Sequence, residues 1–350
     1  MKKLGILLSL LCVTAVGIIL GWHSQTWQSA ANPGVNVSFQ NSLAPDGAIV
    51  GDALTGSDRT IRVTPPTIDP ERLMTDVSAL AAPRYATADR DRAQAYILET
   101  LQKAGWSTRL EPFESSSNQT GVNIYAERPG TDPQAGAILL GAHYDTVERS
   151  PGADDNATAV AAVLEAARLL GPIATARTLS IALFDLEEAG LVGSQAFVDQ
   201  RRYPQDLRGA VILEMLGYTC QTDGCQHYPT VLPITPPTQK GDFLAVIGDQ
   251  GHRPLIDSFI QASRANLPPL LTLPVPLLGP FIPDLLRSDH APFWRSGIGA
   301  VMVTDTANFR NPHYHQPSDT LDSLDRDFFA GSTQLVVNAL TVLLNGQDAL

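Results

Sequence analysis

Short apolar segments alternate with amphipathic segments along most of this chain, which predicts strands and helices in turn. Segments that are apolar throughout, such as residues 181–184 and 211–213, are typical of strands buried on both faces. The predicted strands are residues 107–112, 122–127, 137–142, 179–184, 210–215, 243–247 and 300–303. Helical spacing of apolar residues predicts helices over residues 89–104, 156–170, 191–201, 252–265, 292–296 and 324–344. We therefore expect an α/β three-layer sandwich with a mixed, mostly parallel central sheet.

Two proline-rich stretches interrupt this alternation. Residues 228–242 hold four prolines, and residues 268–283 hold six prolines interleaved with leucines. Proline breaks a helix and cannot donate to a strand ladder, so neither stretch is expected to form a regular helix or a central strand. We interpret both as long, stiff loops, and such loops in a compact domain usually have a function.

The N-terminal region reads differently from the rest of the chain. Lys2 and Lys3 precede residues 4–22, which carry no charge, so residues 1–22 are either a secretory signal peptide or an uncleaved membrane anchor. Residues 23–67 are rich in Asn, Ser, Gly, Pro and Thr and are interpreted as a linker or tail of low order. The folded domain is then residues 68–350, outside the cytoplasm, and it is tied to a membrane only if the first segment is uncleaved.

Net charge and cysteine content bear on the partners of the protein and on the state of its thiols. The net charge of -12 disfavours a nucleic-acid partner. Cys220 and Cys225 are separated by four residues, and in an exported chain this spacing favours a disulfide. The alternatives are two free thiols or a separate zinc site that uses His227.

Polar side chains lie at the ends of three of the predicted strands or shortly after them. His143 and Asp145 come after residues 137–142, Glu187 and Glu188 come after residues 179–184, and Glu214 lies in the strand over residues 210–215. In open α/β sheets ligands bind at the carboxyl ends of the strands, so these side chains can converge there. A carboxylate in a run as apolar as that of Glu214 is costly unless it is paired or bound to metal. Taken singly, the motifs around His143 and Glu187 have another interpretation. They could be ordinary polar residues at a strand end or at the solvent-exposed start of a helix.

Two further motifs offer ligands. Asp155 opens the helix predicted from residue 156, where a helix cap is the alternative interpretation. His313 and His315 flank Tyr314, and either of the two histidines could be the metal ligand. Residues 288–290, Ser-Asp-His, precede a short apolar segment. They could either cap a helix or belong to the functional site.

The ordered set of five motifs resembles that of the di-zinc aminopeptidase family. The motifs are Gly141-Ala-His143-Tyr-Asp145, Gly152-Ala-Asp-Asp155-Asn156, Asp185-Leu-Glu187-Glu188, Glu214-Met-Leu-Gly217-Tyr218 and His313-Tyr314-His315. This family includes secreted bacterial leucine-type aminopeptidases, glutamate carboxypeptidase II and glutaminyl cyclases. The resemblance covers about residues 122–322 and implies an α/β sandwich of the zinc-exopeptidase type.

The resemblance implies a role for each matching residue. The zinc ligands implied by this match are His143, Asp155, Glu188, Glu214 and His315, with Asp155 bridging the two metals. Asp145 would orient the ring of His143. Glu187 would act as the general base, and Tyr314 would donate a hydrogen bond to the oxyanion. Glu214 departs from the family, which usually has Asp there. The implied function is hydrolysis of terminal peptide bonds by an exported aminopeptidase with two zinc ions per chain and a bridging water.

Two other functions remain as alternatives. One is a glutaminyl cyclase-like acyltransferase with one zinc, and the other is a catalytically inactive ectodomain. The apolar residues of the 268–283 stretch predict a preference for apolar terminal side chains, if the stretch folds over the metals. Packing of this stretch against the core or a membrane surface is the alternative.

Overall fold

The computed structural model describes residues 38–40, 63–115, 118–230, 236–276 and 282–346. These residues belong to one compact unit, residues 35–350. The predicted signal peptide or anchor lies outside the described residues, and so does most of the predicted linker. Within that linker, Ser38–Gln40 forms the short strand β1.

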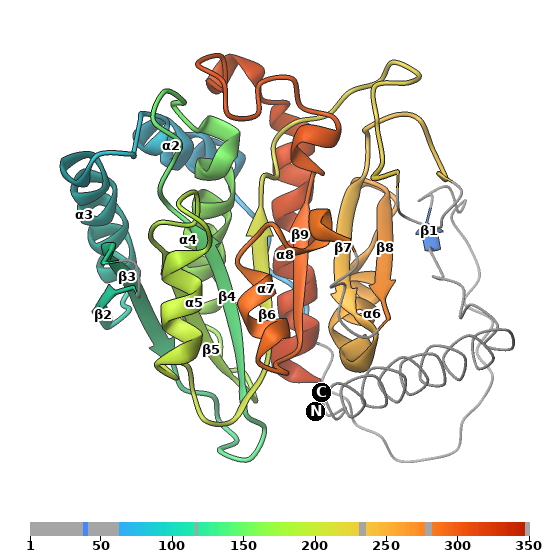
Figure 1. Cartoon of the computed structure of the whole chain (residues 1–350). Helices are drawn as coiled ribbons and strands as arrows, with labels where there is room; N and C mark the ends of the chain where they lie inside the picture. The colour runs from blue at the N-terminus through green and yellow to red at the C-terminus, as the bar shows by residue number, and fades with distance from the viewer. Residues whose placement is uncertain (1–37, 41–62, 116–117, 231–235, 277–281, 347–350) are drawn as a thin grey trace, which may run out of the picture. The chain divides into compact units, whose positions relative to one another are not determined.

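Nine strands of the described chain form one mixed sheet (Figure 1). The order across the sheet is β1-β8-β7-β9-β6-β4-β5-β3-β2. Strands β9, β6, β4 and β5 pair in parallel, as do β7 and β8, whereas the other pairs are antiparallel. The strands after β1 are β2 Thr108–Glu114, β3 Thr120–Arg128, β4 Ala137–His143, β5 Thr178–Phe184, β6 Leu207–Glu214, β7 Leu244–Asp249, β8 Leu270–Val275 and β9 Ala300–Thr304.

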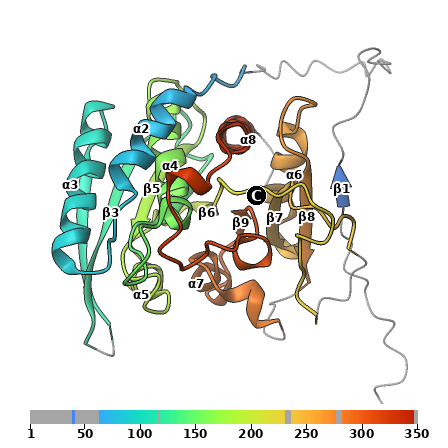
Figure 2. The same cartoon turned by 90° about the horizontal axis from the view of Figure 1, so that it is seen from above.

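Helices cover both faces of this sheet, which confirms the predicted three-layer fold. Figure 2 shows α2, α4, α6 and α8 on one face and α5 and α7 on the other. The larger apolar core lies under the first group, together with α3, and a smaller core lies under the second. The bounds are α2 Pro70–Leu80, α3 Thr87–Lys103, α4 Ala159–Leu170, α5 Val192–Asp199, α6 Arg253–Ala262, α7 His290–Arg295 and α8 Arg326–Asn345.

Local sequence signals fix the ends of two of these helices. Asp69 accepts hydrogen bonds from the backbone N–H groups of Glu71 and Arg72, so it caps α2, and Pro70 occupies the first turn. Asp325 caps α8 by accepting from the N–H of Phe328 at 2.9 Å. Among the described helices, α8 is long and apolar enough to span a membrane, but 72% of its most apolar window is buried, as expected of a core helix.

One sequence-based expectation for the fold is wrong. Residues 270–275, within the proline-rich stretch 268–283, form strand β8 instead of a loop. Among the described residues, strand β1 at the sheet edge pairs with Leu270, Leu271 and Thr272, so Pro274 lies in the strand next to that edge, where a missing N–H is better tolerated than in a central strand. The other stretch, residues 228–242, contains no helix or strand in its described part. Helix α2 and strand β1 were not predicted.

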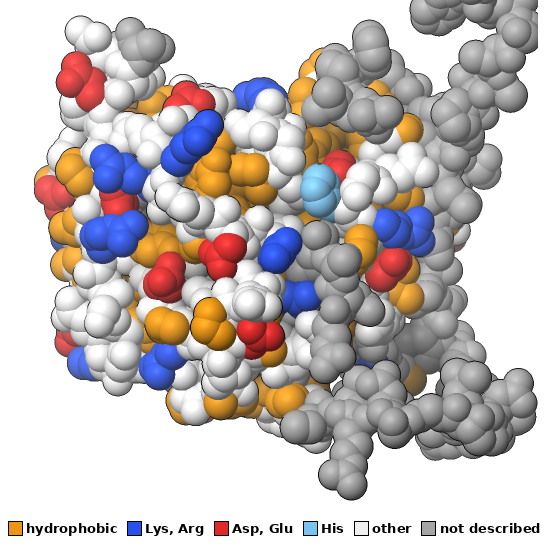
Figure 3. Space-filling model, turned by 90° about the horizontal axis from the view of Figure 1, so that it is seen from below, with side chains coloured by type: hydrophobic (Ala, Val, Ile, Leu, Met, Phe, Trp, Pro, Cys, Tyr) orange, Lys and Arg blue, Asp and Glu red, His pale blue; other side chains and the backbone are white. Residues whose placement is uncertain are grey.

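Charged side chains of both signs are scattered over the face of the protein seen from below (Figure 3). Hydrophobic side chains lie between them without forming one continuous patch in the described part of that face. The clustered polar residues of the sequence motifs are instead found at the carboxyl ends of the central strands.

Candidate metal centre

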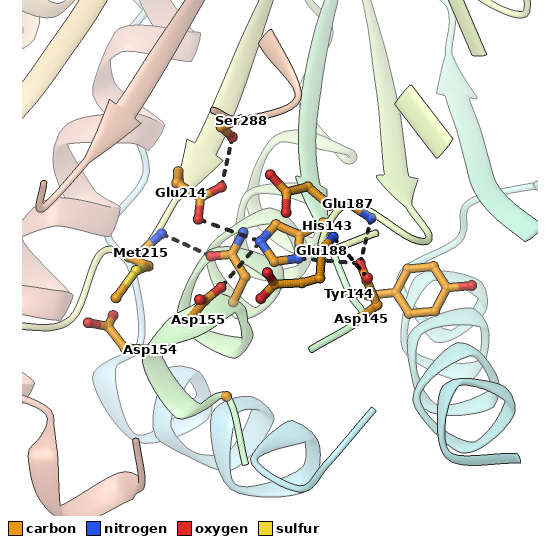
Figure 4. A network of polar contacts seen from close by, with 12 residues as sticks. His143, Tyr144, Asp145, Asp154, Asp155, Glu187, Glu188, Glu214, Met215 and Ser288 are labelled. Carbon is orange, nitrogen blue, oxygen red and sulfur yellow. Dashed lines mark hydrogen bonds and ion pairs between the residues drawn. The ribbon is translucent and has the colours of Figure 1, made fainter. Parts of the chain in front are cut away.

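Three neighbouring strands bring the predicted side chains to one edge of the sheet. His143 is the last residue of β4, and Glu214 is the last residue of β6. Glu187 and Glu188 lie in the loop that follows β5. Since β4 pairs with both β5 and β6, these residues meet at a common carboxyl edge. In Figure 4 the carboxylates are grouped around the ring of His143.

Asp155 lies between the two histidines of the centre. Its Oδ1 is 3.3 Å from Nε2 of His143, and its Oδ2 is 3.2 Å from Nε2 of His315. Nε2 of His143 is also 3.5 Å from Oε1 of Glu214, and Nε2 of His315 is 3.0 Å from Oε2 of Glu188. One carboxylate therefore joins two adjoining sets of ligand atoms.

Two groups of three side chains have ligand atoms within 4.8 Å of one another. One comprises His143, Glu187 and Glu214, and the other comprises Asp155, Glu188 and His315. Both ring nitrogens of His143, Oδ1 of Asp155 and Oε1 of Glu188 are buried without a hydrogen-bond partner. Buried polar atoms are rarely left unpaired. Imidazole nitrogens and carboxylate oxygens are ligands that suit zinc, so the residues fit the metal that the sequence predicts.

His315, and not His313, belongs to this centre. Nδ1 of His313 is 2.8 Å from Oγ of Ser318, and its ring meets that of Tyr218 edge-on. The sequence left the two histidines as competitors, and this geometry separates them.

Asp145 and Ser288 make polar contacts with the candidate ligand residues. The carboxylate of Asp145 accepts hydrogen bonds from the backbone N–H groups of Glu187 at 3.0 Å and Glu188 at 3.2 Å, and its Oδ1 lies 3.5 Å from Nδ1 of His143. Ser288 donates to Oε2 of Glu214 at 2.7 Å. These contacts orient both the ring and the carboxylates.

The backbone around Asp155 and Glu214 is held by two buried polar side chains, Asn156 and Asp319. The side-chain amide of Asn156 donates to the carbonyl of Leu213 and accepts from the N–H of Met215. It therefore fixes the backbone on both sides of Glu214. Asp319 accepts from the N–H groups of Asp154 and Asp155. Asp154 itself points away from the centre in Figure 4.

The protonation of these groups reflects burial and crowding of charge. Burial raises the pKa of Glu187 well above its usual range, and burial together with Asp155 raises the pKa of Glu188 to about 7. Burial would also raise the pKa of Asp155, but the nearby imidazoles of His143 and His315 hold it below its usual range. The centre thus concentrates negative charge, which a cation would balance.

Tyr314 lies beside the centre with its ring stacked on His315, at a centroid distance of 3.7 Å. Its hydroxyl accepts a hydrogen bond from the guanidinium of Arg287 at 3.1 Å. Burial raises the pKa of Tyr314 far above its usual range, so the hydroxyl stays protonated. Because the hydroxyl accepts this hydrogen bond from Arg287, its own proton stays free for donation.

An apolar cavity opens next to Glu214, Ser288 and Tyr314. Its volume is about 100 Å³, and its apolar walls include Phe243, Ala245, Ile247, Leu271, Leu273 and Met302. Leu271 and Leu273 come from the 268–283 stretch, but as residues of strand β8. Leu277, Leu278 and Phe281 of the same stretch lie outside the described residues.

The predicted disulfide between Cys220 and Cys225 is present. Gln226 and His227 follow it directly and line the apolar cavity. The bond therefore constrains a segment that forms part of the cavity wall, and the alternatives of free thiols or a zinc site at Cys220 and Cys225 are wrong.

Sequence reasoning missed Arg84, Asn156 and Asp319, and it left the role of Ser288 open. Asn156 adjoins a predicted ligand, and Asp319 follows His315 closely, so proximity to a motif could have singled out both. Arg84 lies almost sixty residues before the first motif. Its hydrogen bonds to Tyr144, Pro151 and Gly152 span sixty or more residues, so no local sequence signal marks them.

Comparison with known proteins identifies the family of this chain. The sequence model of peptidase family M28 matches residues 123–340. The uncharacterized protein YfbL of Escherichia coli is 31% identical over 302 residues, which cover 81% of this chain and 90% of that protein. A probable leucine aminopeptidase 1 of Trichophyton verrucosum is 26% identical, over 79% of this chain and 74% of that protein.

The fold also matches a solved structure. A zinc aminopeptidase from Bacillus subtilis superposes with a TM-score of 0.64 at 16% identity, over 82% of this chain and 98% of that one. At this identity the likeness concerns the fold alone.

Proposed function

Because this chain belongs to peptidase family M28, we propose that it is a zinc-dependent aminopeptidase that removes amino-terminal residues from peptides. The observation that carries the proposal is the position of Asp155, whose two oxygens face different histidines. Asp155 would bridge two zinc ions, one held with His143 and Glu214 and the other with Glu188 and His315. Bound zinc polarises a carbonyl oxygen and makes water nucleophilic at neutral pH.

The residues of the chain supply the proton transfers. Glu187 takes a proton from the attacking water and passes it to the leaving amine, a role that suits a buried carboxylate with a raised pKa. Tyr314 donates its hydroxyl hydrogen to the oxyanion that develops on the substrate carbonyl. Asp145 and Ser288 hold the ligand residues in place through the hydrogen bonds described above.

The electrostatics of the centre favour action at the amino terminus. A free α-ammonium group is attracted to the excess of carboxylates, whereas a terminal carboxylate is repelled. The disulfide supports a location outside the cytoplasm, in keeping with the predicted signal peptide or anchor.

We expect a graded preference for apolar terminal side chains. The apolar cavity beside Glu214 would receive that side chain, and an apolar pocket separates substrates by only about 1–3 kcal/mol per methylene. On a panel of dipeptides X-Gly, kcat/KM should be highest for Leu and Phe, lower for Ala and poor for Asp and Glu. Fastest cleavage of charged terminal residues would refute this use of the cavity, and no turnover of any peptide would refute the proposed function.

A further inference from the structure

A second cavity opens from the other side of the candidate metal centre. Asp145 and Glu188 belong both to the centre and to the wall of this cavity. In Figure 4, Glu214, which adjoins the apolar cavity, and Asp145 lie on opposite sides of His143. The centre is therefore flanked by two cavities, one on the side of Glu214 and one on the side of Asp145.

The loop between α2 and α3 forms the rim of this second cavity, and Arg84 anchors the loop. The backbone N–H of Arg84 donates to Oγ1 of Thr146 at 2.8 Å, and its guanidinium donates to the carbonyls of Tyr144, Pro151 and Gly152. These acceptors belong to the segment that joins β4 to Asp155. The side chain of Arg84 is buried, so the rim is fixed to the segment that carries the bridging carboxylate.

Tyr85 projects from this anchored loop. Its exposed fraction is 55%, and Leu110 is the only other large hydrophobic side chain with a comparable exposure among the described residues. Tyr85, unlike Leu110, lines the second cavity. An aromatic side chain on a fixed loop offers contact area to a ligand at little cost in conformational entropy. Tyr85 also lies outside residues 123–340, the part of the chain that the family's sequence model matches.

The course of a bound peptide follows from these positions. If the terminal side chain enters the apolar cavity, the remainder of the peptide must leave the centre in another direction. The second cavity begins at Glu188 and Asp145, and its volume of about 520 Å³ compares with about 100 Å³ for the first. It therefore has room for more than one residue.

We propose that the second cavity binds the one or two residues that follow the scissile bond, and that Tyr85 makes it selective for apolar or aromatic side chains there. The inference rests on the proposed aminopeptidase function and adds a substrate class to it: peptides with such a residue at the second or third position.

The test compares Tyr85→Ala with the wild type on four substrates: leucinamide, Leu-Gly-Gly, Leu-Phe-Gly and Leu-Gly-Phe. Leucinamide places no residue in the second cavity. We expect unchanged kcat/KM for leucinamide and Leu-Gly-Gly, and a loss of roughly two- to tenfold for at least one of the two Phe peptides, which is the range for one aromatic contact. Tyr85→Phe should behave like the wild type. Leu110→Ala is the matched control, since it removes an exposed apolar side chain away from the cavity.

Two outcomes would overturn the inference. One is an equal loss on all four substrates, which would mean that Tyr85 merely supports the loop. The other is no selective loss on either Phe peptide. Failure of the wild type to cleave any of the four would instead contradict the proposed function itself, and this inference with it.

Discussion

Glu187→Gln is expected to retain the fold and the bound zinc but to lower kcat for peptide hydrolysis by about 10²–10⁴-fold. The amide has nearly the same shape as the carboxylate, but it cannot accept the proton from water. The backbone N–H of Glu187, which anchors its loop to Asp145, is unaffected by the change. The measurements are kcat on a leucyl dipeptide and zinc content by elemental analysis.

The neighbouring residue provides the matched comparison for this variant. Glu188→Gln should lose zinc as well as activity, because Oε2 of Glu188 faces His315 within the second group of ligand atoms. Glu187 itself lies within 4.8 Å of the ligand atoms of His143 and Glu214. If Glu187→Gln lost zinc, Glu187 would be a ligand; if it kept near wild-type activity, Glu187 would not be the base.

His315→Ala is expected to reduce the zinc content from two ions to one per chain and to lower kcat/KM by at least about 100-fold. Removing a residue that only hydrogen-bonds to a metal ligand typically lowers metal affinity or activity by about 10–100-fold. Removing a ligand itself should lower them further. His315 is the only imidazole among the Asp155, Glu188 and His315 group. Zinc content and kcat/KM on a leucyl dipeptide are the two measurements.

His313→Ala is the control for that change. His313 lies two residues away and is also a half-buried histidine, but Nδ1 of its ring contacts Ser318 instead of the centre. It should bind two zinc ions and turn over at close to the wild-type rate. Equal effects of the two substitutions would show that the segment as a whole, and not the imidazole of His315, matters.

The grouping of the candidate ligand residues could be predicted from sequence because most of them lie at the ends of buried strands. His143 and Glu214 end strands whose apolar character is clear, and Glu187 and Glu188 follow a third. The adjacency of the parallel strands β6, β4 and β5 then brings them together at one edge of the sheet. The resemblance to a known family supplied the individual roles, which the residues alone left open.

Other features depend on contacts that local sequence does not encode. Strand β8 was missed because its prolines outweighed four consecutive residues suited to a buried strand, Leu270–Leu273, and the tolerance for Pro274 comes from its place near the sheet edge. The anchoring of Arg84 joins segments about sixty residues apart. The proposed contact of Tyr85 with substrate depends on that anchoring.

The central claim is that Asp155 joins two metal ions in one centre, and zinc titration tests it most directly. Protein stripped with a chelator would be titrated with zinc, while bound metal per chain and kcat/KM on a leucyl dipeptide are measured at each step. The account predicts two zinc ions per chain, with full activity only when both are bound. Saturation at one tightly held zinc, with no second site filled, would contradict the bridging role of Asp155 and favour the single-zinc acyltransferase alternative.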